Sequence, residues 1–204
     1  GQFVSVADIM ANKLVFTPTA NANGSNYANF TFQVQDDGGT AGGGVDLDQS
    51  PNTMTIDVTS VNDAPAGANK TVVTNEDNTY TFTVADFGFT DPNDTPANSF
   101  LAVKITTLPL NGTLTDDGVG VTLGQFVSVA DIMANKLVFT PAANANGAGY
   151  ANFTFQVQDN GGTLNTGVDL DQSPNTFTIN VGTLNHEPVG TNKTVATNED
   201  NAYT

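Results

Sequence analysis

Apolar and polar residues alternate with a period of two along most of the chain. In YANFTFQVQD, Phe153 and Phe155 are separated by a polar residue, and in NTFTINV the same holds for Phe177 and Ile179. Each such run predicts a half-buried β-strand with one apolar face. Asn-Gly, Asp-Gly and Gly-Gly pairs, which favour tight turns, separate the runs. The pattern therefore predicts seven to nine short strands per 120 residues or so, and an all-β fold of the antiparallel Greek-key β-sandwich type.

A few local features add detail to this pattern. The segment ADIMANKL predicts one helical turn with Asp131 as its N-cap. Asp116-Asp117-Gly118 predicts a hairpin turn, and Tyr150 is expected to be a core residue at the entry to a strand. Asp169 and Asp171 alternate with Leu170, which favours an exposed strand edge over a second metal-binding loop.

The sequence contains a long internal repeat. The eighteen letters GQFVSVADIMANKLVFTP occur at residues 1–18 and again at 124–141, and about 63 of 81 positions are identical when residues 1–81 are aligned with 124–204. A period of about 123 residues has the size of an independent domain. We therefore expect a piece of a longer tandem array, in which 1–61 is the C-terminal half of one repeat, 62–184 is a complete repeat and 185–204 is the start of the next.

Composition narrows the possible partners. The formal net charge is −16, with 5 Lys or Arg residues against 21 Asp or Glu. Binding to nucleic acids or to anionic membranes requires cationic contacts, so we expect neither, and no apolar run is long enough to span a bilayer. The absence of Cys excludes disulfides, and a small extracellular domain without them needs another stabilising element, for which a metal ion is the obvious candidate. Most of the acidic residues are Asp, which is typical of turns and of oxygen-ligand metal loops.

Four short motifs occur in an order that resembles a cadherin-type repeat: NDAP at 62–65, NED at 75–77, DPND at 91–94 and QDNG at 158–161. The segment LPLNGTL at 108–114 and the residues that follow it resemble the chondroitin sulfate proteoglycan repeat. The unit as a whole is similar to the tandem Ig-like or cadherin-like repeats of large bacterial surface proteins and secreted adhesins. This resemblance implies calcium binding between successive domains.

The resemblance also implies a set of ligands, with one or two calcium ions at each junction. Calcium takes six to eight oxygen ligands and tolerates irregular geometry, which suits short Asp and Asn side chains on loops. The ligands expected at the junction Val61–Pro65 are Asn62, Asp63, Asp91, Asn93, Asp94 and Asp159. The ligands expected at the second junction are Glu76, Asp77, Asn185 and Glu187. The alternative is that these acidic loops are only solvated surface.

The second junction differs in sequence from the first. It reads Asn185-His186-Glu187-Pro188, so that His186 stands at the position of Asp63. His186 is the only His in the chain, and we expect it to face solvent. Where cadherin-type repeats carry a further acidic element, this chain has Asn144-Ala145-Asn146.

These observations favour a structural role over catalysis. One His, no Cys and no Arg leave little from which to build a nucleophile, a base and an orienting group, so we expect no enzymatic activity. We expect a structural repeat of a long extracellular, secreted or cell-surface adhesin or surface fibre, acting as a calcium-stiffened spacer. Its partners would be the neighbouring repeats and other copies in a fibre. The alternatives are that the repeats themselves bind a glycan or a cell-surface partner, or that they assemble laterally into a filament or sheath.

Overall fold

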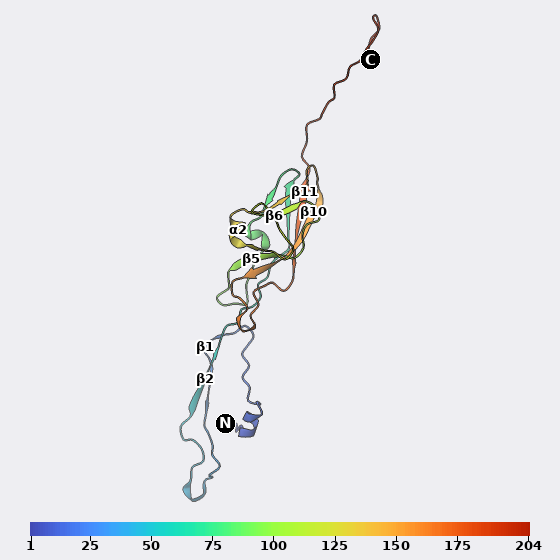
Figure 1. Cartoon of the computed structure of the whole chain (residues 1–204). Helices are drawn as coiled ribbons and strands as arrows, with labels where there is room; N and C mark the ends of the chain where they lie inside the picture. The colour runs from blue at the N-terminus through green and yellow to red at the C-terminus, as the bar shows by residue number, and fades with distance from the viewer.

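The computed structural model describes residues 1–204 and is elongated (Figure 1). A β-sandwich lies in the middle, with a β-hairpin from the N-terminal part of the chain at one end. The C-terminal residues extend from the opposite end as an irregular segment that belongs to neither sheet (Figure 1). None of the helices has the length and apolar character needed to cross a membrane.

The sandwich consists of two sheets built from nine strands. The first sheet has the order β3 (Lys70–Asn75), β11 (Asn175–Gly182), β10 (Gly147–Asp159), β5 (Phe100–Ile105) and β8 (Phe126–Ser128). The second has the order β4 (Tyr80–Thr81), β9 (Leu137–Thr140), β6 (Thr113–Asp116) and β7 (Val119–Gly120). The chain crosses repeatedly from one sheet to the other, and the two sheets confirm the predicted all-β sandwich.

One ladder departs from the predicted antiparallel arrangement. Strand β3 runs parallel to β11, with Lys70 opposite Phe177 and Asn75 opposite Gly182, whereas the other ladders are antiparallel. The prediction of a wholly antiparallel fold is wrong at this ladder. Alternation with a period of two determines which face of a strand is buried, but it carries no information about the direction of the neighbouring strand.

The apolar faces of the strands meet in one aromatic core. The fully buried aromatic side chains are Phe82, Phe87, Phe139, Phe153, Phe155 and Phe177. Phe153 and Phe177, from the adjacent strands β10 and β11, stack with ring centroids 5.3 Å apart and an interplanar angle of 11°. The continuous core lies between Val72 and Val181, and Tyr150 packs against it as expected.

The helical segments are short. Helix α2 (Val129–Met133) has Ser128 as its N-cap, because the Ser128 hydroxyl accepts a hydrogen bond of 3.0 Å from the Asp131 N–H and donates one of 2.6 Å to Asp131 Oδ2. The prediction that Asp131 is the N-cap is therefore wrong, and Asp131 completes a reciprocal capping pair from the first turn. Helix α1 (Val6–Met10) repeats this arrangement. The remaining helical turns are η1 (Ala41–Gly43), η2 (Val84–Phe87) and η3 (Leu164–Thr166).

The N-terminal hairpin repeats the β10–β11 pair without a second sheet to cover it. Strands β1 (Gly24–Phe32) and β2 (Asn52–Val58) pair Phe30 with Met54, as β10 and β11 pair Phe153 with Phe177. Phe30 is 41% exposed, whereas Phe153 is fully buried. The difference arises because the strands that cover β10 and β11 come largely from residues 72–121, and this sequence has no counterpart of them before the hairpin.

Candidate functional site

Two buried carboxylates lie at the first junction, just beyond the linker Val61–Pro65. Asp159 ends strand β10 and is completely buried, and Asp91, on the loop after η2, is 8% exposed. Asp159 Oδ1 accepts hydrogen bonds from the Gly161 N–H at 2.8 Å and from Asn62 Nδ2 at 3.0 Å, and Asp91 Oδ2 accepts one from the Asn98 N–H. The other oxygen of each, Asp159 Oδ2 and Asp91 Oδ1, is buried and has no hydrogen-bond partner.

The electrostatic surroundings of this pair are unfavourable for two negative charges. Burial raises the pKa of Asp159, the hydrogen bonds from Gly161 and Asn62 lower it, and the charge of Asp91 raises it further. Burial likewise raises the pKa of Asp91, and the charges of Asp94 and Asp63 act in the same direction. No Lys or His forms an ion pair with this group. The pair is therefore a desolvated negative centre without a counter-charge.

Asn62 holds the linker onto this centre. Its Nδ2 lies within hydrogen-bonding distance of three oxygens, namely Asp159 Oδ1 at 3.0 Å, Gly162 O at 3.1 Å and Val168 O at 2.8 Å. Its side-chain oxygen accepts a hydrogen bond from Asn98 Nδ2. Both ends of the amide are thus engaged within the repeat, so Asn62, expected as a ligand, acts in this structure as a clamp on the linker.

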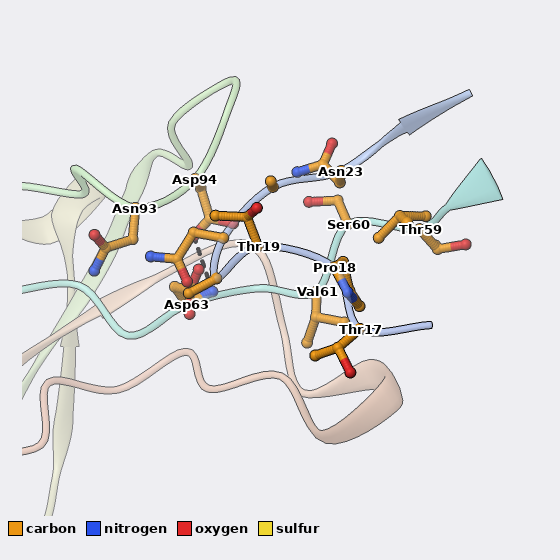
Figure 2. Close-up of a pocket in the computed structure, with 14 residues that line it drawn as sticks. Thr17, Pro18, Thr19, Asn23, Thr59, Ser60, Val61, Asp63, Asn93 and Asp94 are labelled. Carbon is orange, nitrogen blue, oxygen red and sulfur yellow. Dashed lines mark hydrogen bonds between the residues drawn. The ribbon is translucent and has the colours of Figure 1, made fainter. Parts of the chain in front are cut away.

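The remaining residues expected at this junction form an outer group. The Asp63 N–H donates a hydrogen bond of 2.9 Å to Asp94 Oδ2. Asp63, Asn93 and Asp94 line a pocket of about 290 Å³ together with residues 17–23 and 58–61 (Figure 2). The structure therefore brings the six predicted residues of this junction into the same region, as an inner pair and an outer group that lines the pocket. Asp94 of the outer group is as buried as Asp91, at 8% exposure.

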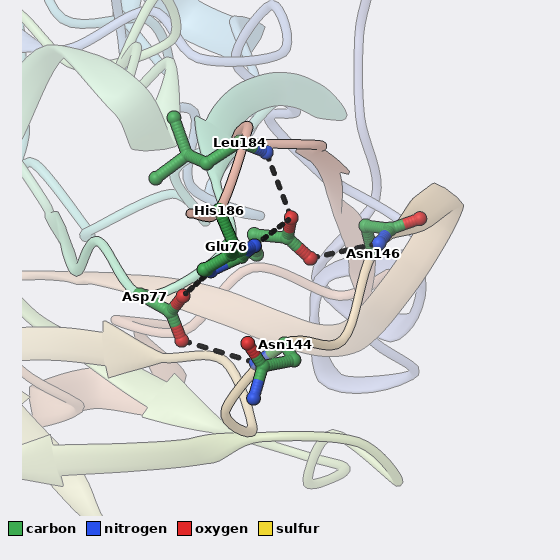
Figure 3. Close-up of polar contacts among 6 residues, drawn as sticks. All are labelled: Glu76, Asp77, Asn144, Asn146, Leu184 and His186. Atoms are coloured by element: carbon green, nitrogen blue, oxygen red, sulfur yellow. Dashed lines mark hydrogen bonds and ion pairs between the residues drawn. The ribbon is translucent and has the colours of Figure 1, made fainter. Parts of the chain in front are cut away.

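Glu76 and Asp77 lie at the other end of the sandwich, in the turn between β3 and β4. Glu76 is 3% exposed, and its carboxylate accepts hydrogen bonds from Asn146 Nδ2 at 2.8 Å and from the Leu184 N–H at 2.7 Å. Asp77 accepts one from the Asn144 N–H at 3.0 Å (Figure 3). These hydrogen bonds hold the pKa of each carboxyl below its usual value. The turn is therefore tied both to the loop before β10 and to the end of β11.

His186 completes this second group. Its Nε2 lies 3.0 Å from Asp77 Oδ2, and its Nδ1 lies 3.9 Å from Glu76 Oε1 (Figure 3). The side chain of His186 is 51% exposed, as expected, and its ring also contacts the turn. Asn185 and Glu187, expected as ligands, are exposed, and no hydrogen bond or ion pair joins either of them to Glu76 or Asp77.

Asn144 and Asn146 were not among the predicted site residues, although each contacts one of the two acids through its backbone or its side chain. The available signal was their position, because they stand where the cadherin-type repeats that the sequence resembles carry acidic side chains. Their chemistry gave no such signal, because an Asn in a turn is common for local reasons.

Asp171 differs from its predicted environment. It is 6% exposed, and its carboxylate accepts hydrogen bonds from the Gly67 N–H, the Ser173 N–H and Asn175 Nδ2. The expectation of an exposed strand edge is wrong for this residue. Asp171 instead organises the turn before β11 and attaches it to the segment that follows the linker.

The fit of these groups to a metal ion is partial. No group of three or more His, Cys, Asp or Glu side chains has an arrangement that could hold a metal ion within the chain. The donors at the first junction are nevertheless oxygens, the type that calcium prefers, and the partnerless atoms Asp91 Oδ1 and Asp159 Oδ2 lie among them. The first junction thus offers the beginning of a coordination shell for a hard cation, which main-chain carbonyls and further side chains would have to complete.

Comparison with known proteins identifies the fold family. A family model described as a bacterial Ig domain matches residues 62–171, more than half of the chain. Neither the curated proteins nor the solved structures contain a match to this chain. The matched region begins at Asn62, at the linker, and includes the buried pair of the first junction.

Proposed function

The chain belongs to the bacterial Ig domain family, and we propose that it serves as a spacer of a long bacterial surface protein, with calcium stiffening junctions like the one at Val61–Pro65. Bacterial Ig domains are structural repeats and typically occur on surface proteins. The observation that carries the calcium part is the pair of buried carboxylate oxygens without partners, Asp91 Oδ1 and Asp159 Oδ2, at the junction. The spacer would hold an adhesive domain, elsewhere in the full protein, away from the cell.

The buried pair Asp91 and Asp159 destabilises the folded state when no cation is bound. A buried polar group without a hydrogen bond destabilises a protein by about 1–3 kcal/mol, and more if it is charged. Two such groups at one place repel each other as well, as the raised pKa values of Asp91 and Asp159 indicate. A divalent cation would offset both penalties at neutral pH, because it supplies the missing partner and the missing positive charge.

The proposed ligands follow from the two groups at the junction. Asp91 and Asp159 would bind the inner side of an ion, and Asp63, Asn93 and Asp94 would contribute ligands from the outer group or bind a second ion. Asn62 would position Asp159 through its amide. The ion itself would supply positive charge and a fixed set of oxygen contacts, and no redox or hydrolytic chemistry.

Stiffening follows from where these residues lie in the chain. Asp63 belongs to the linker, which is only five residues long and ends at the buried Pro65. Asn93 and Asp94 belong to the next repeat and face the loop 17–23 of the preceding half-repeat across the pocket. An ion that takes ligands from the linker and from the 91–94 loop would therefore restrict bending between two successive repeats.

The proposal is tested by calcium titration of the 204-residue chain, first stripped with EDTA. Extracellular calcium modules bind with dissociation constants of about 10⁻⁴–10⁻³ M. At a calcium concentration one hundred times the dissociation constant, the folded state should gain about 2.7 kcal/mol. Isothermal titration calorimetry measures the binding, thermal melting measures the stabilisation, and small-angle scattering measures whether the particle lengthens.

A matched control separates this site from nonspecific screening of an acidic surface. Asp159→Asn should abolish the calcium-induced rise in melting temperature. Asp36→Asn should leave it unchanged, because Asp36 is the exposed counterpart of Asp159 and accepts the same local hydrogen bond, here from the Gly38 N–H, but the given sequence has no counterpart of Asp91 to pair with it. If calcium does not bind, or if both variants lose the response equally, the calcium-stiffened spacer is rejected.

A further inference from the structure

One linker position carries Asp63 at the first junction and His186 at the second, about 123 residues later. We propose that this position decides how a junction closes. A His at this position contacts the Glu-Asp turn of the preceding repeat, which is Glu76–Asp77 at the second junction, and the junction then closes without a cation. An Asp at this position closes the junction only when a divalent cation is bound, and this half of the inference rests on the proposed function.

At the second junction, the linker contacts the preceding repeat directly. His186 Nε2 lies 3.0 Å from Asp77 Oδ2, and Glu76 accepts the Leu184 N–H just before it (Figure 3). The linker is thereby held against the end of the sandwich by one main-chain and one side-chain contact. A neutral imidazole with its proton on Nε2 is sufficient to donate to the Asp77 carboxylate.

The first junction contains the same hydrogen-bond donors, but no acidic turn accepts from them. Asn21, Asn23 and Val61 correspond to Asn144, Asn146 and Leu184, and all three line the pocket that Asp63 also lines. In the complete repeat, the Asn144 N–H, Asn146 Nδ2 and Leu184 N–H donate to the Glu76–Asp77 turn.

The corresponding donors in the first junction, Asn21 N–H, Asn23 Nδ2 and Val61 N–H, make no hydrogen bond. We therefore assign the pocket of about 290 Å³ as a binding site for a Glu-Asp turn like Glu76–Asp77. This turn also forms without packing partners, because Asp200 has the same positive φ, 68°, as Asp77 at 65°.

The two linker residues would then present different groups to the same kind of acidic turn, a hydrogen-bond donor in His186 and a negative charge in Asp63. His186 presents an N–H donor to the carboxylates. Asp63 would present a third carboxylate, with Asp94 close behind it, and like charges at such distances destabilise one another. A divalent cation removes this repulsion, so an array that mixes the two residues would have cation-dependent junctions next to cation-independent ones.

The test uses amide hydrogen exchange, measured by NMR on the 204-residue chain in EDTA and in 10 mM calcium. The reporter is the Leu184 N–H, which bonds to Glu76, and the core residue Phe153 reports on global folding. In the wild-type chain, the protection of Leu184 should be the same in both conditions. His186→Asp should lose at least tenfold protection in EDTA and regain it in calcium, and His186→Gln, which keeps an N–H donor, should resemble the wild-type chain.

Three results would overturn the inference: a wild-type Leu184 whose protection depends on calcium, a His186→Asp chain that stays fully protected in EDTA, or one that calcium does not restore. The two proposals fail separately, because calcium binding at the first junction is measured on the wild-type chain and its Asp159→Asn variant. Binding there without rescue of His186→Asp rejects only the role of the linker residue. Rescue of His186→Asp without binding at Asp159 rejects only the proposed site of the first junction.

Discussion

Asn146 Nδ2 donates a hydrogen bond of 2.8 Å to Glu76 Oε2 and joins two residues that lie 70 positions apart in the sequence. The same carboxylate accepts the N–H of Leu184, so the turn after β3, the start of β10 and the beginning of the linker share one acceptor. Because Glu76 is almost completely buried, these hydrogen bonds are shielded from water and replace the hydration that the carboxylate has lost. The end of the sandwich and the linker therefore form one polar network.

Glu76→Gln should destabilise the folded chain by about 1–3 kcal/mol. The NH₂ group of Gln would face another donor, either Asn146 Nδ2 or the Leu184 N–H, and that donor would lose its acceptor in a buried place. Urea unfolding measures the loss. Glu199→Gln is the matched control, since Glu199 occupies the same position of the following repeat and accepts no hydrogen bond here. The control should change the unfolding free energy by less than about 0.5 kcal/mol, and equal effects of the two changes would contradict the role given to Glu76.

Phe153→Ala should cost about 3–5 kcal/mol of unfolding free energy, because it removes a fully buried ring that stacks on Phe177 and leaves a cavity. The same change at Phe30 is the control, since Phe30 has the same neighbours in sequence and the same strand register but is 41% exposed. Phe30→Ala should cost much less in the same denaturation experiment. Similar losses for the two would mean that the hairpin β1–β2 buries its apolar face as fully as the sandwich does.

The strands could be predicted because residues such as Phe153 and Phe155 alternate with polar residues, and burial of one face is a local property of a strand. The parallel pairing of β3 with β11 could not be predicted in this way, because it depends on which segments of the chain meet in space. The cap of α2 was misassigned for a related reason: Ser128 and Asp131 bond to each other reciprocally, and both are residues that favour helix starts.

The candidate site was predictable to a similar extent. The family resemblance placed Asp91 and Asp159 at the same junction, and the structure brings both to the end of the sandwich that meets the linker. The resemblance gave no indication that His186 would contact Asp77, since that contact depends on the path of the linker. Asn185 and Glu187 were grouped with Glu76 by proximity in sequence to the second junction, but their side chains lie in solvent.

The contribution of Glu76 to stability should decrease in acid. The hydrogen bond from Asn146 is the main cause that lowers the pKa of Glu76 below its ordinary 4.5, followed by that from Leu184. A lowered pKa in the folded state contributes stability above the ordinary value and loses it as the pH falls through the folded pKa. In EDTA, the difference in unfolding free energy between the wild-type chain and Glu76→Gln should therefore shrink as the pH falls below 4.5.

The contribution of Asp159 should change in the opposite direction. Burial raises its pKa above the ordinary 3.8, so its penalty is absent below 3.8 and increases as the pH rises through the folded pKa. In EDTA at pH 7, Asp159→Asn should be at least as stable as the wild-type chain, and this advantage should disappear as the pH falls toward 3.8. Urea midpoints of both chains across pH 3.5–7 measure it. A constant difference would mean that Asp159 is not desolvated.

Gly112→Ala should be more destabilising than Gly118→Ala, although the two glycines have nearly the same backbone conformation, with φ of 75° and 76°. An added Cβ at Gly112 would lie 2.5 Å from Phe139 Cζ and 2.7 Å from Thr140 O, whereas one at Gly118 would meet no atom within 4 Å. Both changes incur the strain of a left-handed Ala, about 1–2 kcal/mol, and overpacking against the buried Phe139 should add about 1–3 kcal/mol at Gly112 alone. Thermal unfolding of the two variants measures the difference directly, because the conformational strain cancels between them. Equal melting temperatures would show that the ring of Phe139 can move aside at no cost, and hence that the core beneath the turn is loosely packed.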